Sequence, residues 1–79
     1  MEIKVLGTGC AGCKALYATV EQVVKELALD AVLTKEEDLV KIMEYNVMAL
    51  PALVVNGKVV AKGKISAREV KEVLEVLTR

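Results

Sequence analysis

Histidine, tryptophan and phenylalanine are absent from this sequence of 79 residues, and basic and acidic side chains balance at eleven each. A structural zinc ion takes four ligands, so two cysteines without a histidine could complete a zinc site only in a dimer. No block of basic residues occurs, so neither nucleic acid nor an anionic membrane surface is expected as a partner. No apolar run approaches the ~20 residues of a membrane span, so no membrane insertion is expected.

The length limits the chain to one domain, residues 1–79, near the lower size at which an apolar core stabilises a fold by itself. An apolar fraction of 54% can build that core without cross-links. Met1 leads directly into the first predicted strand, which leaves no room for a signal peptide. We therefore expect a soluble, cytoplasmic protein without a cofactor. In the cytoplasm thiols are mostly reduced, and cysteine pairs tend to be catalytic or metal-binding.

Both cysteines lie in one short stretch, residues 7–13, between a predicted strand and a predicted helix. Residues 2–6 alternate polar and apolar side chains, as a half-buried strand does. Apolar residues then recur at helical spacing, at Tyr17, Val20, Val24 and Leu27. A helix N-terminus stabilises an anion, and the reactive form of cysteine is the thiolate. The position of the pair therefore favours thiol chemistry over a structural disulfide, which would close too small a loop to stabilise much.

The first helix is predicted from Cys10 or Ala11 to about Leu29. Cys13 falls on its apolar stripe and should be sheltered, whereas Cys10 lies at the very end of the helix and should be accessible. Lys14 follows one turn after Cys10, and we interpret it as an ordinary solvated residue because an exposed ammonium is screened.

The middle of the chain is predicted to hold a buried strand at residues 31–33 and then a short helix. Thr34 to Glu37 fits a capping box, and Leu39, Ile42 and Met43 should form the buried face of the helix, which ends at Tyr45–Asn46. The acidic residues 36–38 could be imagined as a metal site, but an acidic first turn favoured by the helix dipole explains them better.

The last part of the chain carries the clearest local signals. Residues 46–50 form a loop, and Pro51 should head a strand at residues 52–55 because proline cannot donate to a sheet ladder. Asn56–Gly57 predicts a type I′ hairpin turn, with a returning edge strand at residues 58–62. A turn at residues 63–65 and a second capping box at residues 66–69 then open a helix with four inward apolar positions: Val70, Val73, Leu74 and Leu77.

The predicted element order is β-α-β-α-β-β-α. Because helices join the first three strands, these strands are expected to be parallel neighbours with right-handed crossovers. The hairpin adds one antiparallel strand. The fold class is therefore α/β, with a four-stranded mixed sheet flanked by three helices.

At these motifs the chain resembles the thioredoxin and glutaredoxin fold family, and more narrowly its very small archaeal and bacterial redox proteins, in a minimal thioredoxin fold. The resemblance depends on Cys10-x-x-Cys13 opening the first helix, on Pro51 before the third strand, and on the hairpin that leads through Gly63 to the last helix. The chain differs from the family patterns at four places. Ala11–Gly12 lies between the cysteines instead of Gly-Pro or Pro-Tyr, and Gly9 stands where thioredoxins carry tryptophan. Leu50 precedes the proline instead of valine, isoleucine or threonine, and Gly63 alone replaces the double glycine of glutaredoxins.

The resemblance implies a thiol–disulfide oxidoreductase that exchanges a Cys10–Cys13 dithiol with protein disulfides and is recharged by a thioredoxin-reductase-like electron donor. Cys10 would be the nucleophile, Cys13 the resolving cysteine, and Pro51 a cis-proline that faces the substrate. The residues expected to contact substrate are Gly9, Ala11, Gly12, Leu50 and Gly63.

Two other interpretations remain open. Residues 7–13 also resemble the Gly-Met-x-Cys-x-x-Cys loop of copper chaperones, whose soft thiolates suit Cu(I). Thr8 replaces the methionine of that loop, and the chaperone order β-α-β-β-α-β ends in a strand. The third interpretation is a binding module of the same fold with an incidental cysteine pair.

Overall fold

The computed structural model describes residues 1–9, 11–47, 49–63 and 65–77. Its elements follow the predicted order: β1 (Glu2–Leu6), α1 (Ala11–Glu26), β2 (Val32–Glu36), α2 (Leu39–Glu44), β3 (Ala52–Val55), β4 (Lys58–Lys62) and α3 (Ala67–Leu77). The four strands form one mixed sheet in the order β2-β1-β3-β4. The predicted fold class is confirmed. None of the helices in the described ranges is long and apolar enough to cross a membrane.

The direction of β3 differs from the prediction. β1 and β2 are parallel, but β3 pairs with β1 in the antiparallel direction. The helix between β2 and β3 has six residues and extends only about 9 Å, whereas a five-residue strand extends about 17 Å. Since α2 is too short to carry the chain back along the sheet, β3 enters from the end at which β2 leaves.

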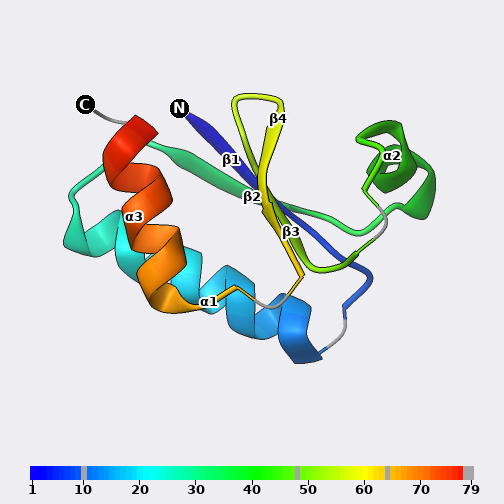
Figure 1. The fold of residues 1–79 in the computed structure, drawn as a ribbon, viewed down its shortest axis with the longest axis horizontal. Helices are drawn as coiled ribbons and strands as arrows, with labels where there is room; N and C mark the ends of the chain where they lie inside the picture. The colour runs from blue at the N-terminus through cyan, green and yellow to red at the C-terminus, as the bar shows by residue number, and fades with distance from the viewer. Residues whose placement is uncertain (10, 48, 64, 78–79) are drawn as a thin grey trace.

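The two faces of the sheet are covered unequally. On one face, Ile3 and Val5 of β1 and Leu53 and Val55 of β3 pack on α1 and α3 in the larger core. On the other face, Leu6, Ala52 and Val54 pack on a single buried residue of α2, Ile42. Figure 1 shows α1 and α3 next to each other, with α1 below the strands and α3 to their left, and α2 apart from both at the other end of the molecule. The end of β1, where the cysteine stretch begins, therefore lies between α1 and α2.

The first helix ends three residues earlier than predicted, at Glu26. Ala28 adopts a left-handed conformation with φ of 51°. The Ala28 N–H donates to Lys25 O and the Leu29 N–H donates to Val24 O, which is the Schellman pattern. This position is usually glycine, so an alanine there does not predict a helix end.

The buried line of α1 also lies slightly to one side of the predicted stripe. Its buried residues are Cys13, Leu16, Val20 and Val23, whereas the predicted Tyr17, Val24 and Leu27 are partly buried around them. Because α1 packs on both the sheet and α3, its apolar face is wider than a single stripe.

The predicted capping box at residues 34–37 is wrong. Thr34 and Glu36 belong to β2, which continues beyond the predicted residues 31–33 because it pairs with β1 through Glu36. The cap of α2 is Asp38, whose side chain accepts from the Val40 N–H at 2.9 Å.

The predicted buried face of α2 is wrong at two of its three residues. Only Ile42 is buried, while Leu39 and Met43 are 55% and 64% exposed. The end of α2 at Tyr45–Asn46 is as predicted, with Tyr45 as C-cap and Asn46 at a φ of 57°.

The hairpin is as predicted, and the last helix is as predicted except at Leu77, which does not face inward. Asn56 and Gly57 both have positive φ, 50° and 83°, as a type I′ turn requires. The bounds of β3 and β4 are those predicted, and β4 is an edge strand. The Ser66 hydroxyl accepts from the Glu69 N–H at the start of α3, where Val70 and Leu74 are buried, Val73 is half-buried and Leu77 is 45% exposed.

Candidate redox site

Cys13 lies in the first turn of α1 and is 6% exposed, which confirms the prediction that it is sheltered. Its sulfur is disulfide-bonded. The other cysteine of the chain, Cys10, lies outside the described residues, so its predicted accessibility remains a prediction. The strand β1 and the helix α1 thus place one oxidised sulfur at the junction that the sequence singled out.

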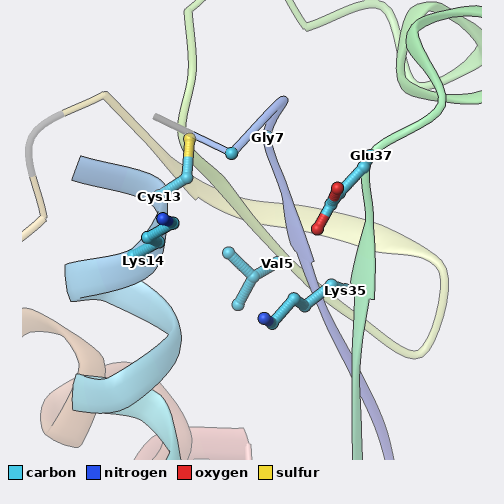
Figure 2. Close-up of a pocket in the computed structure, with 7 residues that line it drawn as sticks. Val5, Gly7, Cys13, Lys14, Lys35 and Glu37 are labelled. Atoms are coloured by element: carbon cyan, nitrogen blue, oxygen red, sulfur yellow. The ribbon is translucent and has the colours of Figure 1, made fainter. Parts of the chain in front are cut away.

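Gly7 allows Cys13 to lie against the end of β1. A Cβ built at position 7 would overlap the Cys13 sulfur and would lie 2.7 Å from the Cys13 Cβ. Figure 2 shows the sulfur turned toward the Gly7 backbone. The Gly7 N–H donates to Glu36 O at 3.0 Å, so this glycine is held between β2 and the cysteine. No sequence pattern predicts this role of Gly7, because the requirement for glycine arises from packing between segments and not from a turn.

Pro51 lies on the same side of the molecule as the start of α1. The Leu50–Pro51 peptide is cis, as the resemblance implied. A Cβ added to Gly12 would lie 3.7 Å from the Pro51 Cδ, so the residue before Cys13 faces the proline ring. Gly63, at a φ of 80°, donates its N–H to Pro51 O at 2.8 Å. The structure therefore brings Gly12, Pro51 and Gly63 together from three distant parts of the chain.

A small crevice of about 40 Å³ opens beside Cys13. Its walls come from β1, from the loop after it, from the start of α1 and from the end of β2, and its lining residues are Val5, Gly7, Gly9, Cys13, Lys14, Lys35 and Glu37. Figure 2 shows Lys14 reaching from α1, and Lys35 and Glu37 reaching from the β2 side, around the Val5 side chain. The crevice thus combines one sulfur, two ammonium groups and one carboxylate.

Lys35 is held in this crevice by α1. It pairs with Val5 in the parallel ladder, and its Nζ lies 4.8 Å from the centroid of the Tyr17 ring. This distance is within the range of a cation–π interaction, which contributes about 0.5–1 kcal/mol at an exposed site. Tyr17 follows Cys13 by one helical turn, so the ring that binds the ammonium is on the same helix as the sulfur.

The remaining predicted site residues are placed as follows. Gly9, at a φ of 87°, and Ala11 flank the undescribed Cys10, and Leu50 is half-buried before Pro51. The residues that sequence reasoning missed are Gly7, Lys35 and Glu37. Glu37 was assigned to a helical turn, but it lies in the connection between β2 and α2.

These features define a protein of the thioredoxin fold with an oxidised cysteine at the start of its first helix and a cis-proline beside it. The order β-α-β-α-β-β-α ends in α3 and differs from the order on which the copper-chaperone alternative depended. A family model described as "Thioredoxin domain" matches residues 1–77. The chain belongs to the thioredoxin family, whose members are thiol–disulfide oxidoreductases.

Two archaeal relatives support this assignment. The chain is 37% identical over 75 residues to a thioredoxin of Methanothermobacter thermautotrophicus, covering 94% of this chain and 97% of the relative. It is 38% identical over 74 residues to a thioredoxin of Methanocaldococcus jannaschii, covering 92% and 85%. A solved structure, thioredoxin 1 of Thermosipho africanus, matches at a TM-score of 0.59 with 15% identity and covers the whole of both chains, which supports the fold.

Proposed function

We propose that this protein is a thiol–disulfide oxidoreductase in which Cys10 and Cys13 cycle between a dithiol and a disulfide while exchanging with disulfides of other proteins. The observation that carries the proposal is the disulfide-bonded Cys13, buried in the first turn of α1. A buried sulfur that is already oxidised suits a redox pair, and membership of the thioredoxin family supports the same type of chemistry.

The proposed reaction has two exchange steps. The Cys10 thiolate attacks one sulfur of a client disulfide, and the other client sulfur leaves with the electron pair. Cys13 then attacks Cys10 in the mixed disulfide, and the second client sulfur leaves. The client disulfide gains two electrons and the Cys10–Cys13 pair loses two. The burial of Cys13 favours this division of roles. A buried sulfur is poorly accessible to a client protein, but a neighbouring sulfur can still reach it.

The client is proposed to bind as an extended segment across Leu50–Pro51. The 3.7 Å between the Pro51 ring and a Cβ added to Gly12 supports this, because it places the proline loop next to the start of α1. The backbone of Leu50 would pair with the client as an added strand does. Gly9, Ala11 and Gly12 would lie under the reacting disulfide, where the largest side chain among them is the methyl group of Ala11. Gly63 would act by holding Pro51 in place through the hydrogen bond to Pro51 O.

A thioredoxin-reductase-like donor is proposed to return the electrons, with the protein working as a reductant in the cytoplasm, where thiols are kept reduced. The equilibrium potential against a dithiothreitol or glutathione buffer tests this direction. A value near the roughly −270 mV of thioredoxin supports a reductant, and a value near the roughly −120 mV of a strong oxidant contradicts it.

Reduction of insulin by dithiothreitol, with and without the protein, tests the activity itself. The wild type should accelerate precipitation of the insulin chains. Cys13→Ser should accumulate mixed disulfides through Cys10, and Cys10→Ser should accumulate none. Equal trapping by both variants would contradict the assigned roles. Absence of turnover together with tight stoichiometric binding of Cu(I) would instead favour a metal-binding module.

A further inference from the structure

The sheet has two edge strands, β2 and β4, and they are protected unequally against pairing with a further strand. Exposed lysines, Lys58 and Lys62, stand at the two ends of β4, and its register with β3 shifts between Leu53 and Val54. Charged ends and an irregular register both disfavour the addition of a strand. The edge of β4 is therefore poorly suited to bind another chain.

β2 is regular, and its single lysine does not shield its outer edge. All five residues, Val32–Glu36, pair with β1 without a shift in register. Figure 2 shows the Lys35 side chain extending from β2 toward α1, where its ammonium lies 4.8 Å from the centroid of the Tyr17 ring. Val32, at the start of the strand, is 63% exposed. The outer edge of β2 is therefore open to another strand.

The hydrogen bonds between β2 and its neighbours show which backbone groups of β2 face outward. The first residue of β2 donates its N–H to Met1 O, and the carbonyl of the last residue accepts from the Gly7 N–H. Backbone groups of successive residues in a strand point to opposite sides, so the central residue also faces β1. The N–H and C=O groups of Leu33 and Lys35 therefore point to the outer edge.

We propose that two copies of this protein pair along their β2 strands in the antiparallel direction, about a two-fold axis at Thr34. Leu33 of each copy would exchange hydrogen bonds with Lys35 of the second copy, which satisfies every outward N–H and C=O group of β2. Thr34 would lie opposite Thr34 of the second copy. The two four-stranded sheets would thus become one continuous sheet.

The charges of β2 favour this register. With the axis at Thr34, Lys35 lies opposite Leu33. Glu36 lies opposite Val32, so no two like charges within the strands are directly opposite each other. An axis at Lys35 would place two lysines opposite each other, which is destabilising. An axis at Leu33 would leave the last two residues of β2 without a partner in the strand. The sequence of β2 is therefore complementary to a second copy of itself.

Two features limit the strength of this dimer. The two Lys35 side chains would be diagonal neighbours across the axis, although each ammonium is held by the Tyr17 ring of its own copy. A ladder of five residues is about 17 Å long, so it buries less than the roughly 800 Å² per partner of a standard interface. We therefore expect a weak dimer that dissociates on dilution.

The antiparallel pairing would keep the two redox sites apart. β1 and β2 run in parallel toward the redox site, and the strands of the second copy would run in the opposite direction. The cysteines of the two copies would then lie at opposite ends of the joined sheet, where clients can reach both. Dimer formation needs no redox step, so its test is independent of the proposed function.

Sedimentation equilibrium of the oxidised protein, from about 10 μM to about 1 mM, measures the association. The average mass should rise with concentration from that of a monomer toward that of a dimer. A monomer at the highest concentration would overturn the proposal, and an extended segment of a different protein would then be the remaining candidate for the open edge.

Thr34→Lys places two lysines opposite each other at the axis and should raise the dissociation constant of the dimer roughly tenfold or more. Thr34→Val adds no charge at the same position and should leave the dissociation constant unchanged or lower it, since valine favours strands. Gln22→Lys controls for net charge, because Gln22 is exposed on α1 in the groove beside α3, and its dimer should equal that of the wild type. An unchanged dissociation constant in Thr34→Lys would overturn the proposal, as would equal weakening in Gln22→Lys. Circular dichroism of each variant establishes that its fold is retained.

A single introduced cysteine tests the register. Two residues opposite each other at the axis have Cα atoms about 4.5 Å apart, a distance that a disulfide spans, whereas the two copies of residue 32 would be about 14 Å apart along the ladder. The chain used carries Cys10→Ser and Cys13→Ser, so that the added thiol is alone. Thr34→Cys should form a cross-linked dimer on oxidation, and Val32→Cys should not. Equal cross-linking of both variants, or of neither, would overturn the proposed pairing.

Discussion

Cys13 packs against Gly7 so closely that a methyl group on Gly7 would overlap the cysteine sulfur. No positive φ requires a glycine at position 7, in contrast to Gly9, Gly57 and Gly63. The requirement is steric, and it ties the end of β1 to the start of α1 at the redox site. The stability of the fold and the placement of the sulfur are therefore coupled at this contact.

Gly7→Ala should destabilise the oxidised protein by about 1–3 kcal/mol, the usual cost of overpacking. Gly12→Ala is the matched control, because its Cβ would meet Pro51 at an ordinary 3.7 Å. It should leave stability unchanged or raise it by up to about 1 kcal/mol, as alanine favours a helix over glycine. Guanidinium unfolding followed by circular dichroism measures both. Equal stability of the two variants would contradict the close contact.

Ala28→Gly should stabilise the protein by about 0.5–1 kcal/mol. An L-residue in the left-handed conformation costs about 1–2 kcal/mol, and glycine removes that cost while adding a smaller loss of chain entropy. Ala18→Gly, on the exposed side of α1, should instead lower stability by about 1 kcal/mol. The midpoints of denaturant unfolding compare the two. A loss of stability in Ala28→Gly would argue against the Schellman ending of α1.

The parts of the fold that the sequence predicted correctly depend on local chemistry. Asn56–Gly57 sets both φ angles of the hairpin turn, so the bounds of β3 and β4 follow from a few neighbouring residues. Ser66 caps α3 by the same kind of local hydrogen bond. The sheltered position of Cys13 followed from helical spacing alone.

The parts that the sequence did not predict depend on contacts between distant segments. β2 continues to Glu36 because β1 pairs with it and the Gly7 N–H donates to Glu36 O, which overrides the local match to a capping box. The crevice arises from the same ladder, because the pairing of Val5 with Lys35 brings the β2 side chains to α1. No local sequence pattern predicts the register between β1 and β2.

Asp38→Ala should destabilise the protein by about 1 kcal/mol, because the Val40 N–H loses its acceptor. Asp38→Asn should cost only a few tenths, since asparagine caps a helix about as well as aspartate. Thermal unfolding of the two variants and the wild type checks this. If Asp38→Asn lost as much as Asp38→Ala, the carboxylate would matter through its charge and not through the cap.

Lys35→Gln should make the redox potential of the protein more negative. Reduction produces a sulfur that can carry negative charge as a thiolate, and a nearby ammonium stabilises that reduced form. Removing the ammonium therefore destabilises the reduced form, so the protein becomes a stronger reductant. An exposed charge pair contributes about 0.2–1 kcal/mol, and roughly 30 mV corresponds to 1.4 kcal/mol for a two-electron couple. The expected shift is about 5–20 mV.

The sign of that shift is checked by equilibration with a glutathione buffer and by two further variants. Lys71→Gln removes the same charge from α3, away from the crevice, and should leave the potential unchanged. Glu37→Gln removes a negative charge from the crevice and should shift the potential in the opposite direction to Lys35→Gln. A shift in Lys71→Gln equal to that in Lys35→Gln would mean that net charge, and not the crevice beside Cys13, sets the potential. Opposite shifts in Lys35→Gln and Glu37→Gln, with an unchanged potential in Lys71→Gln, would locate the effect at the sulfur, because net charge alone would shift the two lysine variants equally.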